Sequence, residues 1–142
     1  MEFNKILVPV VGTEADVRAI ELADRLLTKK NKGIVCAVHT ISIERTLPLD
    51  AEVDSEIRKA EDILDHIENI AGEQGCKIET ELLQAREAGP AIVNEAVERE
   101  VDLILIGVTY KKRFGEFSLG DVVPYVLKNA PCRVIVYHQP IV

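Results

Sequence analysis

The chain has 142 residues, 47% of them hydrophobic and 29% charged, with 24 acidic against 17 basic side chains and a net charge of −7. This composition excludes a disordered chain, and the length predicts one domain over residues 1–142 with a core of its own. The longest apolar runs are about six residues, far below the roughly 20 needed to cross a bilayer. The acidic balance disfavours nucleic acid and anionic membranes as partners.

The start of the chain enters a strand-like run without the features of a signal peptide, which predicts a cytoplasmic location. The three cysteines are widely spaced and form no Cys-x-x-Cys pair, so reduced thiols are predicted rather than disulfides or a zinc site. The three histidines lack metal-ligand spacing, and the one at position 39 is interpreted as a packing or hydrogen-bonding residue. These residues are Cys36, Cys76, Cys132, His39, His66 and His138.

Residues 5–11 are β-branched and apolar on both faces, which predicts a central parallel strand. Gly12 interrupts the strand, and Thr13 with Asp16 resembles a capping box at the start of a helix. Residues 34–41 predict the second strand, followed by a loop over 42–50. A long amphipathic helix is expected from about Ala51, closed by glycines at positions 72 and 75.

Residues 77–83 alternate in polarity and predict an exposed edge strand. The pair Gly89-Pro90 predicts a helix start, with a buried stripe on the following helix. The fourth strand is expected over 103–106, a helix over 119–128 and the fifth strand over 132–137. The buried residues expected on these two helices are Ala91, Ile92, Ala96, Val97, Val122, Val123, Val126 and Leu127.

Alternating strands and helices predict an α/β protein with a doubly wound parallel sheet and helices on both faces. In such sheets a ligand crevice lies at the carboxyl ends of the strands, where the strand order reverses. If the first and fourth strands flank that point, the loops at 11–13 and 107–121 face each other.

Four segments together resemble the universal stress protein family, and the resemblance covers nearly the whole chain. They are Lys5-Ile6-Leu7-Val8-Pro9, Val38-His39, Asp102-Leu103-Ile104-Leu105-Ile106-Gly107 and Asn129-Ala130-Pro131-Cys132-Arg133-Val134. The resemblance implies a five-stranded parallel sheet in the order 3-2-1-4-5 and a homodimer formed through the last strand. The apolar strand 133–137 also supports a dimer by itself, because little sequence follows it to cover a sheet edge.

The ATP-binding branch of this family has a Gly-x2-Gly-x9-Gly-Ser/Thr pattern and an Asp two residues after the first-strand Pro. Laid on this chain, the pattern keeps Gly107 and Gly120 but has Tyr110 for the second glycine and Asp121 for the hydroxyl residue. Val11 replaces the first-strand Asp. Tyr cannot substitute for the backbone freedom of Gly. A carboxylate about 4 Å from phosphate costs roughly 1–4 kcal/mol.

The leading interpretation is therefore a homodimeric, non-enzymatic regulatory or stress-response domain whose degenerate pocket binds ATP weakly or not at all. One alternative is an adenine-nucleotide-binding module for ATP or AMP, in which a basic loop holds a small anionic ligand, although such a charge run is usually a solvated loop. Another is a regulatory domain or partner of a membrane transporter. The candidate pocket residues are Pro9, Val11, Thr13, Thr40, Gly107, Tyr110, Lys111, Lys112, Arg113, Gly120 and Asp121. No catalytic or metal-binding residue is predicted.

Overall fold

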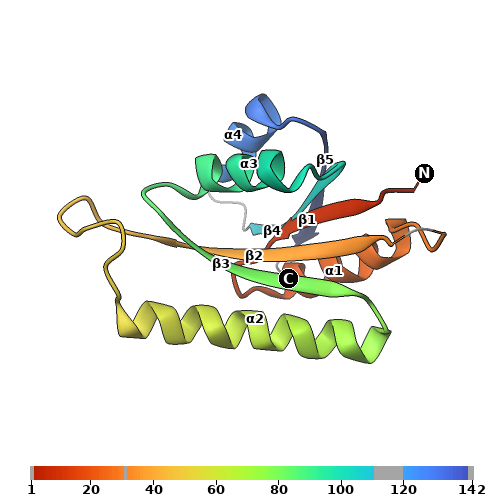
Figure 1. The fold of residues 1–142 in the computed structure, drawn as a ribbon, viewed down its shortest axis with the longest axis horizontal. Coiled ribbons are helices and arrows are strands. Elements are labelled where there is room, and N and C mark those ends of the chain that lie inside the picture. The colour runs from red at the N-terminus through yellow and green to blue at the C-terminus, as the bar shows by residue number, and fades with distance from the viewer. Residues whose placement is uncertain (1, 31, 111–119, 141–142) are drawn as a thin grey trace.

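The computed structural model describes residues 2–30, 32–110 and 120–140. Five parallel strands form one sheet in the order β3-β2-β1-β4-β5, as predicted (Figure 1). The strands are β1 (Lys5–Pro9), β2 (Ile34–Ser42), β3 (Ile78–Ala85), β4 (Leu103–Tyr110) and β5 (Arg133–Pro140). The helices are α1 (Glu14–Leu26), α2 (Asp54–Gln74), α3 (Ala88–Arg99) and α4 (Val122–Asn129).

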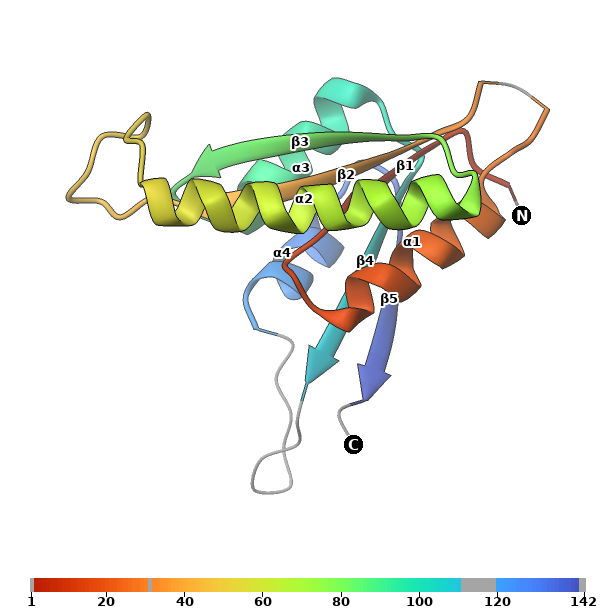
Figure 2. The same cartoon turned by 90° about the horizontal axis from the view of Figure 1, so that it is seen from below.

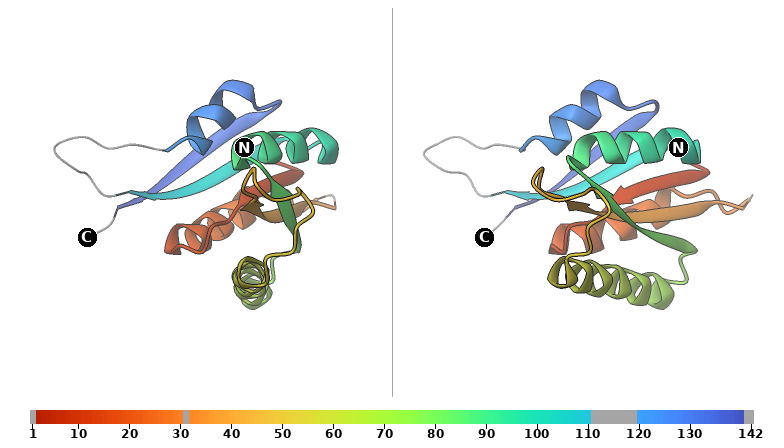
Figure 3. Two further views of the ribbon diagram at one scale, coloured as in Figure 1. Left: turned by 90° about the vertical axis from the view of Figure 1, so that its left-hand side faces the viewer. Right: turned by 60° about the vertical axis from the view of Figure 1, so that its left-hand side comes forward.

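The helices cover both faces of the sheet, with α1 and α2 on one side and α3 and α4 on the other (Figure 3). Each side has its own apolar core, because alternate residues of the central strands point to opposite faces. In β1, for example, Ile6 and Val8 belong to the core under α1 and α2, whereas Leu7 belongs to the core under α3 and α4. Ile6, Leu7 and Val8 are all fully buried, as expected for a central parallel strand.

The sheet has β3 at one edge and β5 at the other. The prediction that the third strand lies at an edge is therefore confirmed. β5 pairs with β4 from Arg133 to Pro140, and the two strands run side by side in the same direction (Figure 2). No helix within the described ranges is long and apolar enough to cross a membrane.

Several predicted boundaries are wrong, among them the ends of the fourth and fifth strands, which extend to Tyr110 and Pro140, and the start of the last helix, which lies at Val122. For two others the structure shows the cause. The first strand ends at Pro9 rather than position 11, because the following backbone N–H groups turn toward the Asp16 carboxylate. The long helix begins at Asp54 rather than at Ala51. The Ala51 carbonyl oxygen accepts a 3.0 Å hydrogen bond from the Gln84 side chain, and the Ala51 N–H donates to Pro48, so this segment is a turn.

The buried stripes of α3 and α4 are also shifted from the predicted ones. Val97 and Leu127 are 55% and 54% exposed, whereas Val93, which was not predicted to be buried, is 8% exposed. The buried face of α3 thus contains Ile92, Val93 and Ala96, and Val97 lies outside it. The cysteines at 36 and 76 are buried free thiols and Cys132 is a half-buried one, as predicted.

Candidate functional site

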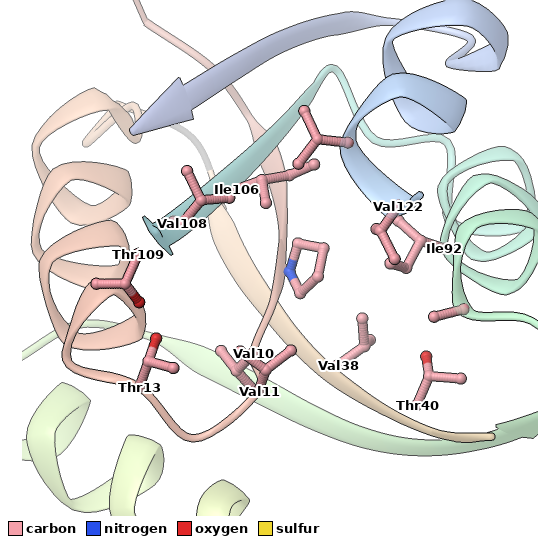
Figure 4. Close-up of a pocket in the computed structure, with 14 residues that line it drawn as sticks. Val10, Val11, Thr13, Val38, Thr40, Ile92, Ile106, Val108, Thr109 and Val122 are labelled. Atoms are coloured by element: carbon pink, nitrogen blue, oxygen red, sulfur yellow. The ribbon is translucent and has the colours of Figure 1, made fainter. Parts of the chain in front are cut away.

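A cavity of about 210 Å³ lies where the carboxyl ends of β1, β2 and β4 meet the first turns of α3 and α4 (Figure 4). The strands contribute Pro9, Val38 and Ile106, and the helices contribute Ile92 and Val122. This is the position at which doubly wound sheets bind ligands, because the adjacent strands β1 and β4 are followed in the chain by helices on opposite faces of the sheet, α1 and α4. The fold therefore creates the cavity before any particular side chain is considered.

The structure brings several predicted site residues together around this cavity. Pro9, Val11, Thr13, Thr40 and Gly107 all line it. The loop after β1 and the end of β4 thus face the same space, as expected if the first and fourth strands flank the crevice.

Other predicted residues lie elsewhere. Asp121 precedes α4 and lines a neighbouring cavity of about 360 Å³, which shares Ala88 and Val122 with the first cavity. Gly120 lies in the turn before α4 with φ +71°. Lys111, Lys112 and Arg113 fall outside the described residues, as does the side chain of Tyr110, whose backbone ends β4.

The loop between β1 and α1 is held by one buried carboxylate. Asp16, 2% exposed, accepts hydrogen bonds from the backbone N–H groups of Val11 at 3.1 Å, Gly12 at 2.6 Å and Thr13 at 3.1 Å. Gly12 has φ +95°, which favours glycine at this turn. These donors lie at a helix N-terminus, where an external anion could otherwise bind, so the protein's own carboxylate already occupies them.

Two opposing effects act on the Asp16 carboxyl. Burial raises its pKa above the ordinary 3.8, and the N–H donors of Gly12, Val11 and Thr13 oppose that rise. On the same face of the sheet, His39 donates from Nδ1 to the Val10 carbonyl oxygen at 2.8 Å, which agrees with its interpretation as a hydrogen-bonding residue. The loop between β1 and α1 is therefore held by side chains at both kinds of backbone group: His39 bonds to the Val10 carbonyl oxygen, and Asp16 bonds to the N–H groups of residues 11–13.

Close packing of β4 against α1 requires a glycine at position 107. A Cβ atom at this position would contact the Ala15 carbonyl oxygen and would lie 2.9 Å from the Ala15 carbonyl carbon and 3.2 Å from the Ala19 Cβ. The backbone of β4 can therefore approach α1 this closely only without a side chain. This requirement exists whether or not a ligand is bound at the same position.

The described lining of the cavity carries no ionisable side chain. Val11, which replaces the carboxylate expected from the ATP-binding pattern, is 58% exposed at the rim. The polar side chains of the described lining are the hydroxyls of Thr13, Thr40 and Thr109. Such a surface suits an apolar ring with a few hydrogen-bonding groups, and it supplies no positive charge for a phosphate.

The sequence interpretation missed the contributions of Thr109, Val108 and the helix residues Ala88 and Ile92 to this cavity. Thr109 and Val108 were overlooked because β4 was expected to end at position 106, whereas it continues to Tyr110. Ile92 was identified as buried, but the helical pattern does not distinguish a residue that packs on the sheet from one that lines a cavity. The predicted capping box of Thr13 and Asp16 is confirmed and accounts for one donor to Asp16, the Thr13 N–H. The bonds from the Val11 and Gly12 N–H groups depend on the turn of the loop and were not predicted.

Comparisons with known proteins agree with this arrangement. The model of the universal stress protein family matches residues 2–138. The universal stress protein MJ0531 of Methanocaldococcus jannaschii is 32% identical over 144 residues, covering 97% of this chain and 84% of that protein. The universal stress protein YxiE of Bacillus subtilis is 28% identical over 146 residues, covering 94% and 98%.

A solved structure shows the same architecture. The universal stress protein from Archaeoglobus fulgidus in complex with dAMP is 25% identical, with a TM-score of 0.73 and coverage of 96% of this chain and 98% of that one. The strand order, the cavity at the carboxyl ends of the strands and the family match over almost the whole length support one assignment. The chain belongs to the universal stress protein family.

Proposed function

We propose that this chain is a non-enzymatic regulatory domain of the stress response whose pocket binds ATP weakly or not at all. The observation that carries the proposal is the uncharged lining of the cavity in the described part of the chain. A triphosphate needs positive side chains or free backbone N–H groups. The N–H groups of Val11, Gly12 and Thr13 are already engaged by Asp16.

Two replaced residues support the same conclusion. Val11 leaves the rim of the cavity without a hydrogen-bonding carboxylate. Asp121 places an exposed negative charge at the start of α4, beside the cavity that adjoins the first. The positive end of the α4 dipole is therefore partly neutralised before a phosphate could use it.

The proposal is tested by calorimetric titration of the purified protein with Mg-ATP. We expect no saturation below millimolar concentrations, and a micromolar Kd would overturn the weak-binding proposal. The double variant Val11→Asp with Asp121→Ser restores the two family residues without altering the apolar walls. ATP affinity should increase in this variant, because the hydrogen-bonding carboxylate returns at the rim and one repulsive charge is removed.

A second candidate function is adenine-nucleotide binding supported by Lys111, Lys112 and Arg113. It is favoured by the relative from Archaeoglobus fulgidus, which was solved with dAMP at 25% identity. Under this alternative, ATP or AMP raises the Tm of the wild-type protein. The triple alanine variant at these positions should lose that increase while retaining the Tm of the free protein.

We further propose that the functional unit is a homodimer assembled through residues 133–137 of β5. Within the described residues, β5 pairs with β4 along one side only, and its apolar side chains Val134, Ile135 and Val136 are half-buried in the isolated chain. An edge of this kind recruits a second strand or a packing partner. Sedimentation velocity at tens of micromolar should show a dimer, whereas a single monomeric species would refute this assembly.

A further inference from the structure

Strand β3 lies at one edge of the sheet, opposite the edge formed by β5 (Figure 2). Its pairing with β2 keeps one register throughout, from the bond between the Val35 N–H and the Lys77 carbonyl oxygen at 3.1 Å. At the other end, the Ile43 N–H donates to the Ala85 carbonyl oxygen at 2.8 Å. Because backbone groups of successive strand residues point to opposite sides, the odd-numbered residues of β3 bond to β2. The residues whose N–H and C=O groups point away from β2 are Ile78, Thr80, Leu82 and Gln84.

This outer row of backbone groups can accept a further strand. Within the described residues, no strand pairs with it. An extended segment that adds to such an edge gains affinity from main-chain hydrogen bonds. The end of the edge is the less accessible part, because the Gln84 side chain donates to the Leu49 and Ala51 carbonyl oxygens, at 3.0 Å each, and so holds a loop beside it. The open stretch therefore runs from Ile78 to Leu82.

Acidic side chains flank this stretch on the face that carries α3. The Arg99 guanidinium bonds to three carboxylates, at 3.1, 3.4 and 2.7 Å. They belong to Glu79 and Glu81 of β3 and to Glu95 of α3. One positive charge thus serves three negative ones, and the side chains of Glu79 and Glu81 remain 58% and 47% exposed. This cluster has a negative surplus that attracts a cationic partner.

A hollow on the other face of β3, toward α2, combines apolar and acidic residues. Leu49, Ile57 and Leu82 supply its apolar surface. Asp50 and Glu52 line the same hollow and are exposed. A lysine or arginine side chain suits such a place, because its aliphatic part packs on apolar groups while its charged end reaches carboxylates in water. Both faces of the edge therefore favour a basic partner.

A second copy of β3 fits this edge poorly. In an antiparallel pair centred on Thr80, Glu79 of each copy would lie opposite Glu81 of the other, and like charges at opposed positions are destabilising. Charged side chains of this kind oppose self-pairing of an edge, and they favour a strand of opposite charge. The cations Arg45 and Arg86 line a hollow with residues 83–87, at the far end of the strand, so they leave the acidic stretch to the partner.

We propose that the edge of β3 from Ile78 to Leu82 binds an extended basic segment of another protein as an added strand. Lysine or arginine side chains at alternate positions of that segment face Glu79 and Glu81. The side chains between them point to the face of α2 and lie beside Leu82. This surface is separate from the cavity at the carboxyl ends of the strands, so the proposal holds whether or not the protein binds ATP. It also leaves β5 free for the dimer.

The test is fluorescence anisotropy of the full chain with a labelled peptide that alternates lysine and valine and has the eight-residue length of β3. At physiological ionic strength we expect saturable binding with a Kd below about 1 mM. A peptide of the same length that alternates glutamate and valine should not bind. Absence of binding by the basic peptide, or equal binding by the acidic one, would overturn the proposal.

Two N-methylated forms of the basic peptide distinguish strand addition from attraction between charges alone. Methylation of the valine nitrogens removes the donors that face β3 in an antiparallel strand, and methylation of the lysine nitrogens removes those that face it in a parallel strand. Affinity should fall at least about tenfold in one of the two forms, which corresponds to about 1.4 kcal/mol, and that form gives the strand direction. Equal affinities of the two forms would contradict strand addition.

A pair of matched variants tests the acidic cluster. Glu79→Gln with Glu81→Gln should lower the affinity for the basic peptide about tenfold, or about 1.4 kcal/mol, because two carboxylates that face its lysines are lost. The control is Glu14→Gln with Glu21→Gln, since these two carboxylates likewise share one guanidinium, that of Arg18 on α1. The control changes the net charge by the same amount and should leave affinity unchanged. Equal losses in the two double variants would refute a local role for Glu79 and Glu81.

Amide hydrogen exchange of the wild-type protein locates the peptide without any substitution. Binding should slow exchange at Ile78, Thr80 and Leu82 and leave Glu79 and Glu81 unchanged, because the N–H groups of the latter already bond to β2. Slowing that excludes the first three amides would place the peptide elsewhere and overturn the proposal. Protection of the same three amides in the free protein that increases with its concentration would identify a second copy as the occupant, and the basic partner would be wrong.

Discussion

The change Gly107→Ala should destabilise the free protein, although this glycine belongs to a pattern associated with nucleotide binding. The added methyl group would contact the Ala15 carbonyl oxygen and would lie within 3.2 Å of the Ala19 Cβ. Neither neighbour is the end of a flexible side chain, because one is helix backbone and the other is a buried methyl group. Helix α1 must therefore move away from β4.

Overpacking of this kind costs typically 1–3 kcal/mol, and the involvement of helix backbone favours the upper end, about 3 kcal/mol. For a chain of 142 residues, each kcal/mol lowers Tm by roughly 2–4 °C, so the expected decrease is roughly 6–12 °C. Urea denaturation followed by circular dichroism measures the free energy of unfolding directly and shows through the m-value whether the variant remains two-state.

The matched control is Gly72→Ala within α2, where an added Cβ meets nothing within 4 Å. This change should stabilise the protein by about 0.5–1 kcal/mol, because alanine loses less backbone entropy than glycine in a helix. If Gly107→Ala lowers the free energy of unfolding while Gly72→Ala raises it, the need for glycine at position 107 comes from packing. A Gly107→Ala variant within about 0.5 kcal/mol of wild type would refute this reasoning, since surface substitutions have effects of that size.

Three further predictions concern buried polar groups. Thr40→Val should raise the free energy of unfolding of the ligand-free protein by about 1 kcal/mol in urea denaturation, because it removes a buried hydroxyl that has no hydrogen-bond partner among the described residues. The pKa of Asp16 is raised by burial, so the folded state takes up the proton more readily than the unfolded state does. The free energy of unfolding of wild type relative to Asp16→Asn should accordingly increase as pH falls through that raised pKa toward 3.8; a difference that decreases with acid would contradict the direction. Burial, with a contribution from Asp24, raises the pKa of Cys76 to about 12, so the unfolded thiol ionises first and stability should fall as pH rises above about 8.5. Cys76→Ala should reduce this fall in alkaline denaturation curves.

The sequence predicted the fold well where apolar runs are long and continuous. Residues 6–9 and 103–106 are apolar on both faces, and a central parallel strand buries both faces of such a run. Boundaries were predicted less well where side chains from distant elements intervene. The start of α2 depends on a bond from Gln84 to the Ala51 carbonyl, which no local pattern in residues 42–54 indicates.

In the candidate site, too, features that follow from the strand order were predicted, and features that depend on contacts between distant elements were missed. Val11 and Gly107 were identified from the family's pattern, and together with Thr13 from the expectation that the loops after the first and fourth strands face each other; all three line the cavity. The wall formed by Ala88 and Ile92 was missed, because which residues of an amphipathic helix line a cavity depends on how that helix sits over the sheet. The unpartnered state of the Thr40 hydroxyl likewise depends on all its neighbours together.

The bonds of Asp16 have a consequence for how this domain could transmit a signal. A loop held by its own carboxylate is already ordered before a ligand arrives, so binding would spend little free energy on ordering it. One wall of the cavity therefore behaves as a fixed support. Any conformational response would have to originate in the opposite wall, where α3 and α4 rest on the sheet and on each other largely through apolar contacts. Tyr125 of α4 packs against Gly89 of α3, so a shift of one helix would alter its contact with the other at that point.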